Sequence, residues 1–428
     1  MATFSGTDRL RDLQAFDNTK AGVKGLVDAG VTAIPYFFRH HPDPFPIAAP
    51  SEAAAAILVI DLAKADVDRG HVVSQAGVKG LVDAGVTTVP YFFRHHPDPL
   101  PVAAPRPTST SPRPTSTGDG WSPRAAAETV GFFQVVNHGV AGELMEEMLA
   151  AVRRFHEEPL EAKVPYYTRD VASKVWFNSN FGLFRNGFRS PEANWRDTMF
   201  VEMFPEAPSP EEIPPPCRGV LEVYAAAVRR LGERLFELLS EALGLPVGYL
   251  GRDAGCMDGL SLSVAAHYYP ACPEPEATMG ATKHSDPSFL TVLLQDTSGG
   301  LQAVLPRPPE ERWVDVPPVA GALVVNVGDL LQLVSNDRLR SVEHRVLPTG
   351  AAGPARVSVA CFFRHAYAST RPCVPVVVGG GGARAAAVYR STTAGEFLAH
   401  YNGKGLDGRS ALDHFRLPAA ASSPPPPL

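Results

Sequence analysis

Hydrophobic residues recur along this chain with two different spacings, and the spacing changes near the middle. In residues 221–238 the apolar side chains lie three or four positions apart, which predicts a long amphipathic helix that ends at Gly244. Further helices are predicted over 142–155 and 394–401. From residue 262 onward short apolar runs alternate with turn residues, as expected for β-strands. The pattern therefore predicts helices that flank a strand-rich second half.

Two more strands are predicted before the long helix, over residues 56–62 and 129–136. In the second half, turn signals such as T-S-G-G at 297–300 and N-V-G-D at 326–329 separate the apolar runs. Many short strands at such intervals are typical of a double-sheet jelly roll. We therefore predict an α+β fold in which a double-stranded β-helix (jelly-roll) core is flanked by helices.

The first part of the chain contains a nearly verbatim repeat. Residues 21–50 return at 76–105 with changes only at positions 33, 34, 45 and 47. Solenoid repeats diverge and come three or more at a time, so two such copies indicate a recent duplication or a gene-model error. Residues 71–75 and 124–129 would form one helix of ordinary length if joined. We therefore predict that 76–123 is a poorly packed insertion, which lies on the surface or competes for the place of the first copy.

These patterns divide the chain into four predicted regions. They are an N-terminal region with the duplicated segment and a linker (1–123), a helical region (124–255), the jelly-roll core (256–368), and a C-terminal helical segment with a disordered tail (369–428).

Composition narrows the classes of partner. The net charge of −6 and the absence of a basic cluster argue against nucleic-acid and membrane-surface partners. The five cysteines are odd in number, scattered and never C-x-x-C, so neither a disulfide framework nor a zinc site is indicated. No apolar run is long enough to span a membrane, and the N-terminus shows no apolar targeting segment. We expect a soluble cytoplasmic monomer.

Three residues could form a metal site. His284 and Asp286 lie two positions apart just before the strand-like run 289–294, so extended backbone would project both from one face. His344 lies in a later apolar segment and could supply the third ligand. Two imidazoles and a carboxylate on one face of a metal are the ligands of non-haem Fe(II) oxygenases, and they leave positions open for a chelating co-substrate and dioxygen.

A possible anchor for a carboxylate follows the last of these residues. Arg356 and Ser358 are two positions apart and would share one strand face. There a guanidinium fork and a hydroxyl can hold a carboxylate. Iron together with a carboxylate anchor implies an oxo-acid co-substrate.

Both repeats also contain the string H-P-D, at His41–Asp43 and at His96–Asp98. Prolines flank both aspartates, and proline donates no ladder hydrogen bond, so an interior strand cannot carry either pair. We expect neither to bind metal. The G-G-G-G run at 379–382 lacks the context of a nucleotide-binding loop and is expected to be a flexible connector.

The order H-x-D, distant H and R-x-S resembles the plant 2-oxoglutarate- and Fe(II)-dependent dioxygenases. The resemblance extends from V-I-D-L at 59–62 to H-F-R-L at 414–417. Within that superfamily the chain looks most like the 1-aminocyclopropane-1-carboxylate oxidase homologues, through K-G-L-D-G-R-S-A-L-D-H-F at 404–415 and the opening G-T-D-R-L-R-D-L-Q-A-F-D. The resemblance implies an Fe(II) site, 2-oxoglutarate as co-substrate, and ascorbate to keep the iron reduced.

The same resemblance suggests roles for further residues. Tyr269 matches a tyrosine that helps to hold 2-oxoglutarate. The usual N-x-Y pattern is His267-Tyr268-Tyr269 here, and we expect His267 to support the site or the core because a fourth protein ligand would fill a position that the co-substrate needs. Phe362 and Phe289 would either pack on substrate or belong to the core.

The implied activity is oxidation, typically hydroxylation, of a small specialised metabolite by dioxygen, with release of succinate and CO2. One alternative is a true 1-aminocyclopropane-1-carboxylate oxidase, which forms ethylene with ascorbate in place of 2-oxoglutarate; the K-G-L-D-G-R-S segment disfavours it. The other is a non-catalytic jelly-roll binder of a metabolite, which would be expected to lose at least one iron ligand. The identity of the substrate does not follow from the sequence.

Overall fold

The computed structural model describes ten parts of the chain: residues 6–41, 47, 57–63, 131–170, 172–180, 192–257, 260–305, 311–377, 386–405 and 409–418. The second copy of the repeat, the linker after it, the predicted helix segments 71–75 and 124–129, the glycine run at 379–382 and the C-terminal tail lie outside the described residues.

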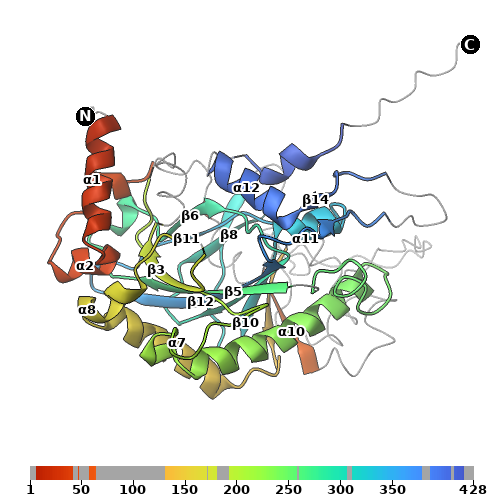
Figure 1. Ribbon diagram of the computed structural model, residues 1–428, viewed down its shortest axis with the longest axis horizontal. Helices are drawn as coiled ribbons and strands as arrows, with labels where there is room; N and C mark the ends of the chain where they lie inside the picture. The colour runs from red at the N-terminus through yellow and green to blue at the C-terminus, as the bar shows by residue number, and fades with distance from the viewer. Residues whose placement is uncertain are drawn as a thin grey trace, which may run out of the picture.

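Two sheets form the centre of the molecule (Figure 1). The large sheet has eight strands in the order β1-β2-β10-β7-β12-β5-β4-β3. Their bounds, in that order, are Leu58–Asp61, Phe132–Val136, Leu323–Val327, Leu290–Gln295, Arg356–His365, Leu260–Tyr269, Asp197–Glu202 and Val175–Ser179. Neighbouring strands are antiparallel except β1 and β2, which are parallel.

The small sheet has four antiparallel strands in the order β6-β11-β8-β9. They span Ala281–His284, His344–Val346, Leu301–Leu305 and Arg312–Asp315. Phe132, Tyr269 and Val324 of the large sheet share a buried cluster with Leu301 and Ala303 of the small one. The two sheets therefore enclose an apolar layer, which confirms the predicted jelly-roll core. A separate pair, β13 (Pro372–Cys373) and β14 (Thr392–Thr393), precedes the last helix.

Helices cover the outside of this core. α7 (Gly142–Glu157) and α10 (Val220–Ala242) run along one face of the large sheet, as Figure 1 shows. Both were predicted from their apolar spacing, as was α12 (Ala394–Lys404). The remaining helices and 3-10 turns are α1 (Gly6–Asn18), α2 (Gly22–Asp28), η1 (Tyr36–Phe38), α8 (Leu160–Lys163), η3 (Val164–Tyr166), η4 (Pro215–Cys217), η5 (Pro275–Ala277), α11 (Asp329–Val334) and η7 (Ala411–Phe415). None of the helices in the described ranges is both long and apolar enough to cross a membrane.

Alternate residues of β12 point to opposite faces of the large sheet. Phe363 lies on the face covered by α10, where a Cβ added to Gly232 would come within 2.1 Å of its ring. The helix therefore packs closely on the strand at this glycine. The opposite face looks toward the small sheet, and we call it the site face; β12 contributes Arg356, Ser358, Ala360 and Phe362 to it.

The sequence predicts that residues 76–123 are an insertion, and this prediction can be tested by removal. Deletion of 76–123 should raise both solubility and the melting temperature, because the predicted insertion would expose a second set of apolar residues. Binding of Fe(II) and 2-oxoglutarate should be unchanged. Thermal unfolding and sedimentation of the deletion variant measure this.

A matched variant separates the effect of the apolar residues from that of chain length. Replacing 76–105 by a glycine-serine segment of equal length should give a similar gain. If the deletion variant unfolds, or if limited proteolysis finds 76–123 as protected as the core, the prediction is wrong.

Candidate metal centre and carboxylate anchor

The three predicted metal ligands meet at one end of the small sheet. His284 is the last residue of β6, and Asp286 follows in the loop that leads to β7. His344 begins β11, which pairs with β6 so that His344 lies opposite His284. The ligand atoms of the three side chains all lie within 4.8 Å of one another, and no other such group occurs among the described residues. The pairing of two short strands thus brings together residues about sixty positions apart.

Hydrogen bonds orient both imidazole rings. Nδ1 of His284 lies 2.6 Å from the carbonyl oxygen of Thr282, and Nδ1 of His344 lies 3.3 Å from that of Val342. A carbonyl accepts only, so each Nδ1 carries the proton and each Nε2 keeps a lone pair. The Nε2 atoms of His284 and His344 lie 3.7 Å and 3.6 Å from Oδ1 of Asp286. Three lone-pair donors therefore converge, as a divalent metal requires.

Asp286 is held by two neighbours on the site face. Its Oδ2 accepts hydrogen bonds from the hydroxyl of Thr291 at 2.6 Å and from Nδ2 of Asn326 at 2.8 Å. Thr291 and Asn326 are paired across β7 and β10. Since both bonds go to Oδ2, Oδ1 is left to face the two histidines.

Burial and nearby charges favour a neutral His284 and an ionised Asp286 at neutral pH. Burial, followed by the charge of His344, lowers the pKa of His284 to about 4. Burial alone would raise the pKa of Asp286, but the imidazoles and the hydrogen bonds from Asn326 and Thr291 outweigh it and lower that pKa. A neutral imidazole and a carboxylate are the forms that bind metal, so the residues present fit an Fe(II) ion.

The hydrogen bond from Thr291 should contribute to metal affinity. Thr291→Val keeps the shape of the side chain but removes the donor to Asp286, and loss of such a supporting contact typically costs roughly 10–100-fold in metal affinity. Anaerobic Fe(II) titration measures the effect. Thr291→Ser retains the hydroxyl and should bind iron nearly as the parent does. Equal affinity of the valine variant and the parent would contradict this role.

Arg356 lies on the same face of the sheet, at the first position of β12. Its side chain is only 1% exposed. Nε donates to the carbonyl oxygen of Gly299 at 2.7 Å, Nη1 to Oγ of Ser358 at 2.9 Å, and Nη2 to Oε1 of Gln295 at 3.1 Å. The ring of Tyr269, which is opposite Arg356 in β5, lies 4.9 Å from the guanidinium carbon. The structure therefore brings Arg356, Ser358 and Tyr269 together as predicted.

Among the described residues, the charge of Arg356 has only neutral partners. Within the described parts of the chain no carboxylate forms an ion pair with it, although a buried cation is costly unless an anion compensates it. Nε2 of Gln295, on the next strand, is also buried and has no hydrogen-bond partner in the described part of the chain. Burying such a donor unpaired is unfavourable. Both groups would be satisfied by the oxygens of a bound carboxylate.

His267 supports the site without joining the metal ligands. It lies opposite Ser358 on β5, and its Nδ1 is 3.0 Å from Oγ1 of Thr198. Burial, followed by the charges of Arg196 and Arg356, lowers the pKa of His267 well below its usual value. The ring is therefore neutral and held in the wall of the site.

The two candidate pocket residues have different surroundings. Phe289 is fully buried in the main core, with its ring centroid 5.0 Å from that of His365. Its contacts therefore favour core packing over contact with substrate. Phe362 is half-buried on the site face, opposite Ser263 of β5 and Thr291 of β7. Of the two phenylalanines, Phe362 stays a candidate for the substrate pocket.

Three contributors to the site were not predicted from the sequence. Thr291 and Gln295 belong to the strand after Asp286, where their spacing of four positions places them on one face. That spacing was the available signal. The sequence pattern placed Asn326 in a turn, yet it lies within the buried strand β10 and donates a hydrogen bond to Asp286. Of the histidines and aspartates in the two H-P-D strings, only His41 lies in a described part of the chain, and it is not one of the three residues of the metal group.

The fold and the site define an oxygenase that uses a metal and an oxo acid, and comparison with known proteins agrees. A model of the 2OG-Fe(II) oxygenase superfamily matches residues 261–365, and a model described as the non-haem dioxygenase in morphine synthesis N-terminal matches residues 124–218. The chain is 45% identical over 417 residues to 1-aminocyclopropane-1-carboxylate oxidase homolog 1 of Arabidopsis thaliana, covering 96% of this chain and 97% of the relative. A homologue from Solanum lycopersicum is 38% identical over 414 residues, with 96% and 97% covered. The chain therefore belongs to the 2OG-Fe(II) oxygenase superfamily.

Solved structures show the same fold. The crystal structure of JOX2 in complex with 2OG, Fe and JA matches with a TM-score of 0.68 and 25% identity, covering 93% of this chain and 98% of that chain. The dioxygenase for auxin oxidation from rice matches with a TM-score of 0.55 and 26% identity, covering 69% and 92%. The predicted family, fold class, enzyme class and use of Fe(II) and 2-oxoglutarate are thus confirmed.

Proposed function

We propose that His284, Asp286 and His344 hold Fe(II) while Arg356, Ser358 and Tyr269 hold the far carboxylate of 2-oxoglutarate. The observation that carries this assignment is the buried charge of Arg356, which no carboxylate among the described residues pairs with, on the same face as a three-ligand metal group. A dicarboxylate that chelates the iron at one end would pair with the guanidinium at the other. The enzyme then oxidises a small specialised metabolite with dioxygen and releases succinate and CO2.

The iron, when bound, supplies the activation of dioxygen, and the protein contributes position and electrostatics. Arg356 fixes the co-substrate through a planar fork that an ammonium group cannot reproduce. Thr291 and Asn326 fix the carboxylate ligand. His267, neutral and bonded to Thr198, adds no charge to the wall beside the co-substrate.

The substrate would lie beside the iron on the site face. Two small residues of this face, Ala265 of β5 and Ala360 of β12, are paired with each other. The aromatic Phe200 of β4 is paired with Ala265 on its other side. Trp176 stacks on Phe200 with ring centroids 5.2 Å apart. Together with Phe362, these side chains give the site face small and aromatic surfaces that suit a flat, ring-containing metabolite. JOX2 was crystallised with JA and the rice protein is described as acting in auxin oxidation, which supports a small organic substrate.

A direct test compares two products. Purified enzyme with Fe(II), 2-oxoglutarate and a plant metabolite extract should form succinate, whereas 1-aminocyclopropane-1-carboxylate with ascorbate should yield no ethylene. The reverse result would show a true 1-aminocyclopropane-1-carboxylate oxidase. Absence of both products, with Fe(II) bound, would favour a non-catalytic binder. The complete set of three ligands argues against that last alternative.

We also propose that the enzyme acts in the cytoplasm as a monomer, uses ascorbate to keep iron reduced, and has no nucleic-acid or membrane partner. All five cysteines are free and buried, which supports a reducing compartment. The net charge of −6 is unfavourable for binding polyanions. Light scattering of the purified protein and the location of a tagged copy in plant cells test these points.

A further inference from the structure

The first copy of the repeat occupies a groove on the core. Val23, Ile34, Phe37 and Phe38 of this copy form a small apolar cluster with Ala193, Trp195 and Cys272 of the core. Phe38 is fully buried, and its ring centroid lies 5.1 Å from that of Trp195. We call the surface of the core that holds this copy the repeat groove. It consists of Ser179, Ala193, Trp195, Asp197, Cys272, Glu274 and Ala277.

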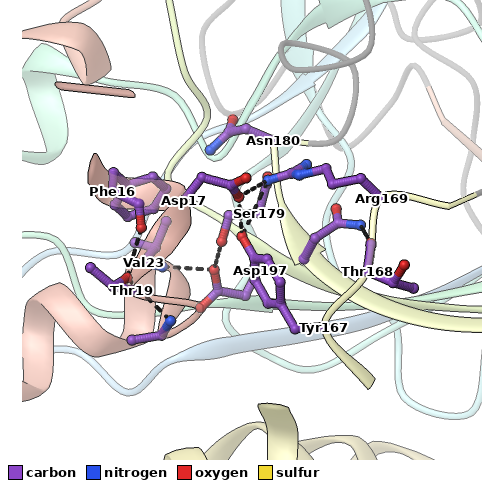
Figure 2. Close-up of polar contacts among 12 residues, drawn as sticks. Phe16, Asp17, Thr19, Val23, Tyr167, Thr168, Arg169, Ser179, Asn180 and Asp197 are labelled. Carbon is purple, nitrogen blue, oxygen red and sulfur yellow. Dashed lines mark hydrogen bonds and ion pairs between the residues drawn. The ribbon is translucent and has the colours of Figure 1, made fainter. Parts of the chain in front are cut away.

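Polar contacts fix the position of the repeat in this groove. Asp197, at the start of β4, accepts a hydrogen bond from the backbone N–H of Val23 at 2.7 Å (Figure 2). It also accepts one from the backbone N–H of Lys24 at 2.8 Å. The hydroxyl of Ser179 also donates to Asp197. Gly22 has φ +67°, and a Cβ there would lie 2.4 Å from Oδ1 of Asp197. The groove therefore requires a glycine followed by two free N–H groups.

The other end of the repeat is held by Glu274 and Ala193. Glu274 accepts from the backbone N–H of Ile34 at 2.7 Å and pairs with Arg39 at 2.7 Å. Nε2 of His40 lies 2.8 Å from the carbonyl oxygen of Ala193, whose N–H donates to the carbonyl of Phe37 at 2.7 Å. Most of these contacts use backbone groups of the repeat, so they depend on its conformation more than on its side chains.

The second copy has the same residues at nearly every one of these positions. Each lies 55 positions after its counterpart, so that Gly77, Val78, Lys79, Phe92, Phe93, Arg94 and His95 correspond to Gly22, Val23, Lys24, Phe37, Phe38, Arg39 and His40. Among the contacts with the repeat groove the one difference is Val89 in place of Ile34. The contact of Ile34 with Glu274 is made by its backbone N–H, and valine keeps an apolar side chain for the cluster.

We propose that the repeat groove also accepts residues 76–105 of the same chain, so that the two copies exchange in one site. β1 lies between the copies and is fixed in the large sheet by β2. The 16 residues that follow Asp61, up to and including Gly77, could span up to about 50 Å when extended. Such a tether gives an effective concentration that a second molecule reaches only in concentrated solution, which favours exchange within one chain over pairing of two chains.

The helix before the first copy, α1, favours binding of the first copy in the repeat groove over binding of the second. Leu13 and Phe16 of α1 are buried with the first copy, and Asp17 pairs with Arg169 at 2.6 Å and accepts from Tyr167 (Figure 2). The duplication begins after this helix, so the second copy has no counterpart of α1. The first copy is therefore the preferred occupant, and loss of α1 should shift the groove toward the second.

Cross-linking can measure how often each copy lies in the repeat groove. Glu274→Cys is combined either with Arg39→Cys or with Arg94→Cys, and a bis-maleimide about as long as the Arg39–Glu274 ion pair joins the thiols. The native cysteines are buried, and burial raises the pKa of Cys272, the one in the groove, to about 11, so they react slowly. Glu274→Cys alone gives the background.

The expected result is a 94–274 link within a single chain, weaker than the 39–274 link. It should strengthen when residues 1–18 are deleted or when Val23→Asp weakens the first copy. Val78→Asp is the matched control and should abolish the 94–274 link while leaving the 39–274 link unchanged. If the 94–274 link stays at background in both weakened variants, joins two chains, or survives Val78→Asp, the proposal is wrong. The readout is independent of enzyme activity.

Discussion

Replacing Asp286 by alanine should abolish both Fe(II) binding and turnover. The variant loses the carboxylate oxygen that faces Nε2 of both histidines, 3.7 Å and 3.6 Å away. His284→Ala and His344→Ala should have the same effect, because each removes one of three ligands from a site that has no fourth among the described residues. Anaerobic Fe(II) titration and succinate formation measure the two losses.

The fold should survive these substitutions, because none of the three side chains belongs to the main apolar core. Circular dichroism and the melting temperature check this. His138→Ala is a suitable control, since this histidine contacts the carbonyl oxygen of Gly321 and is not part of the metal group. Undiminished Fe(II) affinity in all three ligand variants would refute the assignment.

Replacing Arg356 by lysine should weaken 2-oxoglutarate binding before it affects iron. An ammonium group cannot reproduce the fork that contacts Gly299, Ser358 and Gln295. Loss of hydrogen bonds to a charged group costs about 1.5–3 kcal/mol, or roughly 10- to 150-fold in affinity. The KM for 2-oxoglutarate should rise by that factor while Fe(II) affinity stays the same.

Arg345→Lys is the matched control for this variant. Arg345 is also buried, but it lies on the small sheet, where it stacks on Trp313 and donates to Gln302. Its replacement should lower stability without changing the KM for 2-oxoglutarate. If the KM is unchanged in Arg356→Lys as well, the carboxylate is held elsewhere.

Two pairs of the predicted site residues could be recognised in the sequence because the geometry within each pair is local, whereas His344 joins His284 and Asp286 only through the pairing of β11 with β6. His284 and Asp286 are two positions apart, as are Arg356 and Ser358, and a strand places such pairs on one face without further information. The amphipathic helices α7 and α10 were predictable for a similar reason, since their apolar spacing is continuous.

The supporting residues depend on strand order, which the sequence does not reveal. Asn326 reaches Asp286 only because β10 is the neighbour of β7, and Gln295 reaches Arg356 only because β7 is the neighbour of β12. Phe289 illustrates the same limit. Its position near the H-x-D pair suggested a place in the pocket, but its ring lies against His365 in the core. The division into four regions and the insertion at 76–123 stay predictions.

The proposed Fe(II)- and 2-oxoglutarate-dependent oxidation is tested most directly by the release of labelled CO2 from 2-oxoglutarate labelled at its first carbon. The purified full chain would be supplied with Fe(II), ascorbate and a plant metabolite extract. Labelled CO2 should form in equal amount to succinate. It should be lost when Fe(II) is withheld and in Asp286→Ala, and strongly reduced in Arg356→Lys at low 2-oxoglutarate. Release no greater than that of the Asp286→Ala variant, from protein shown to bind Fe(II), would contradict the proposed oxidation.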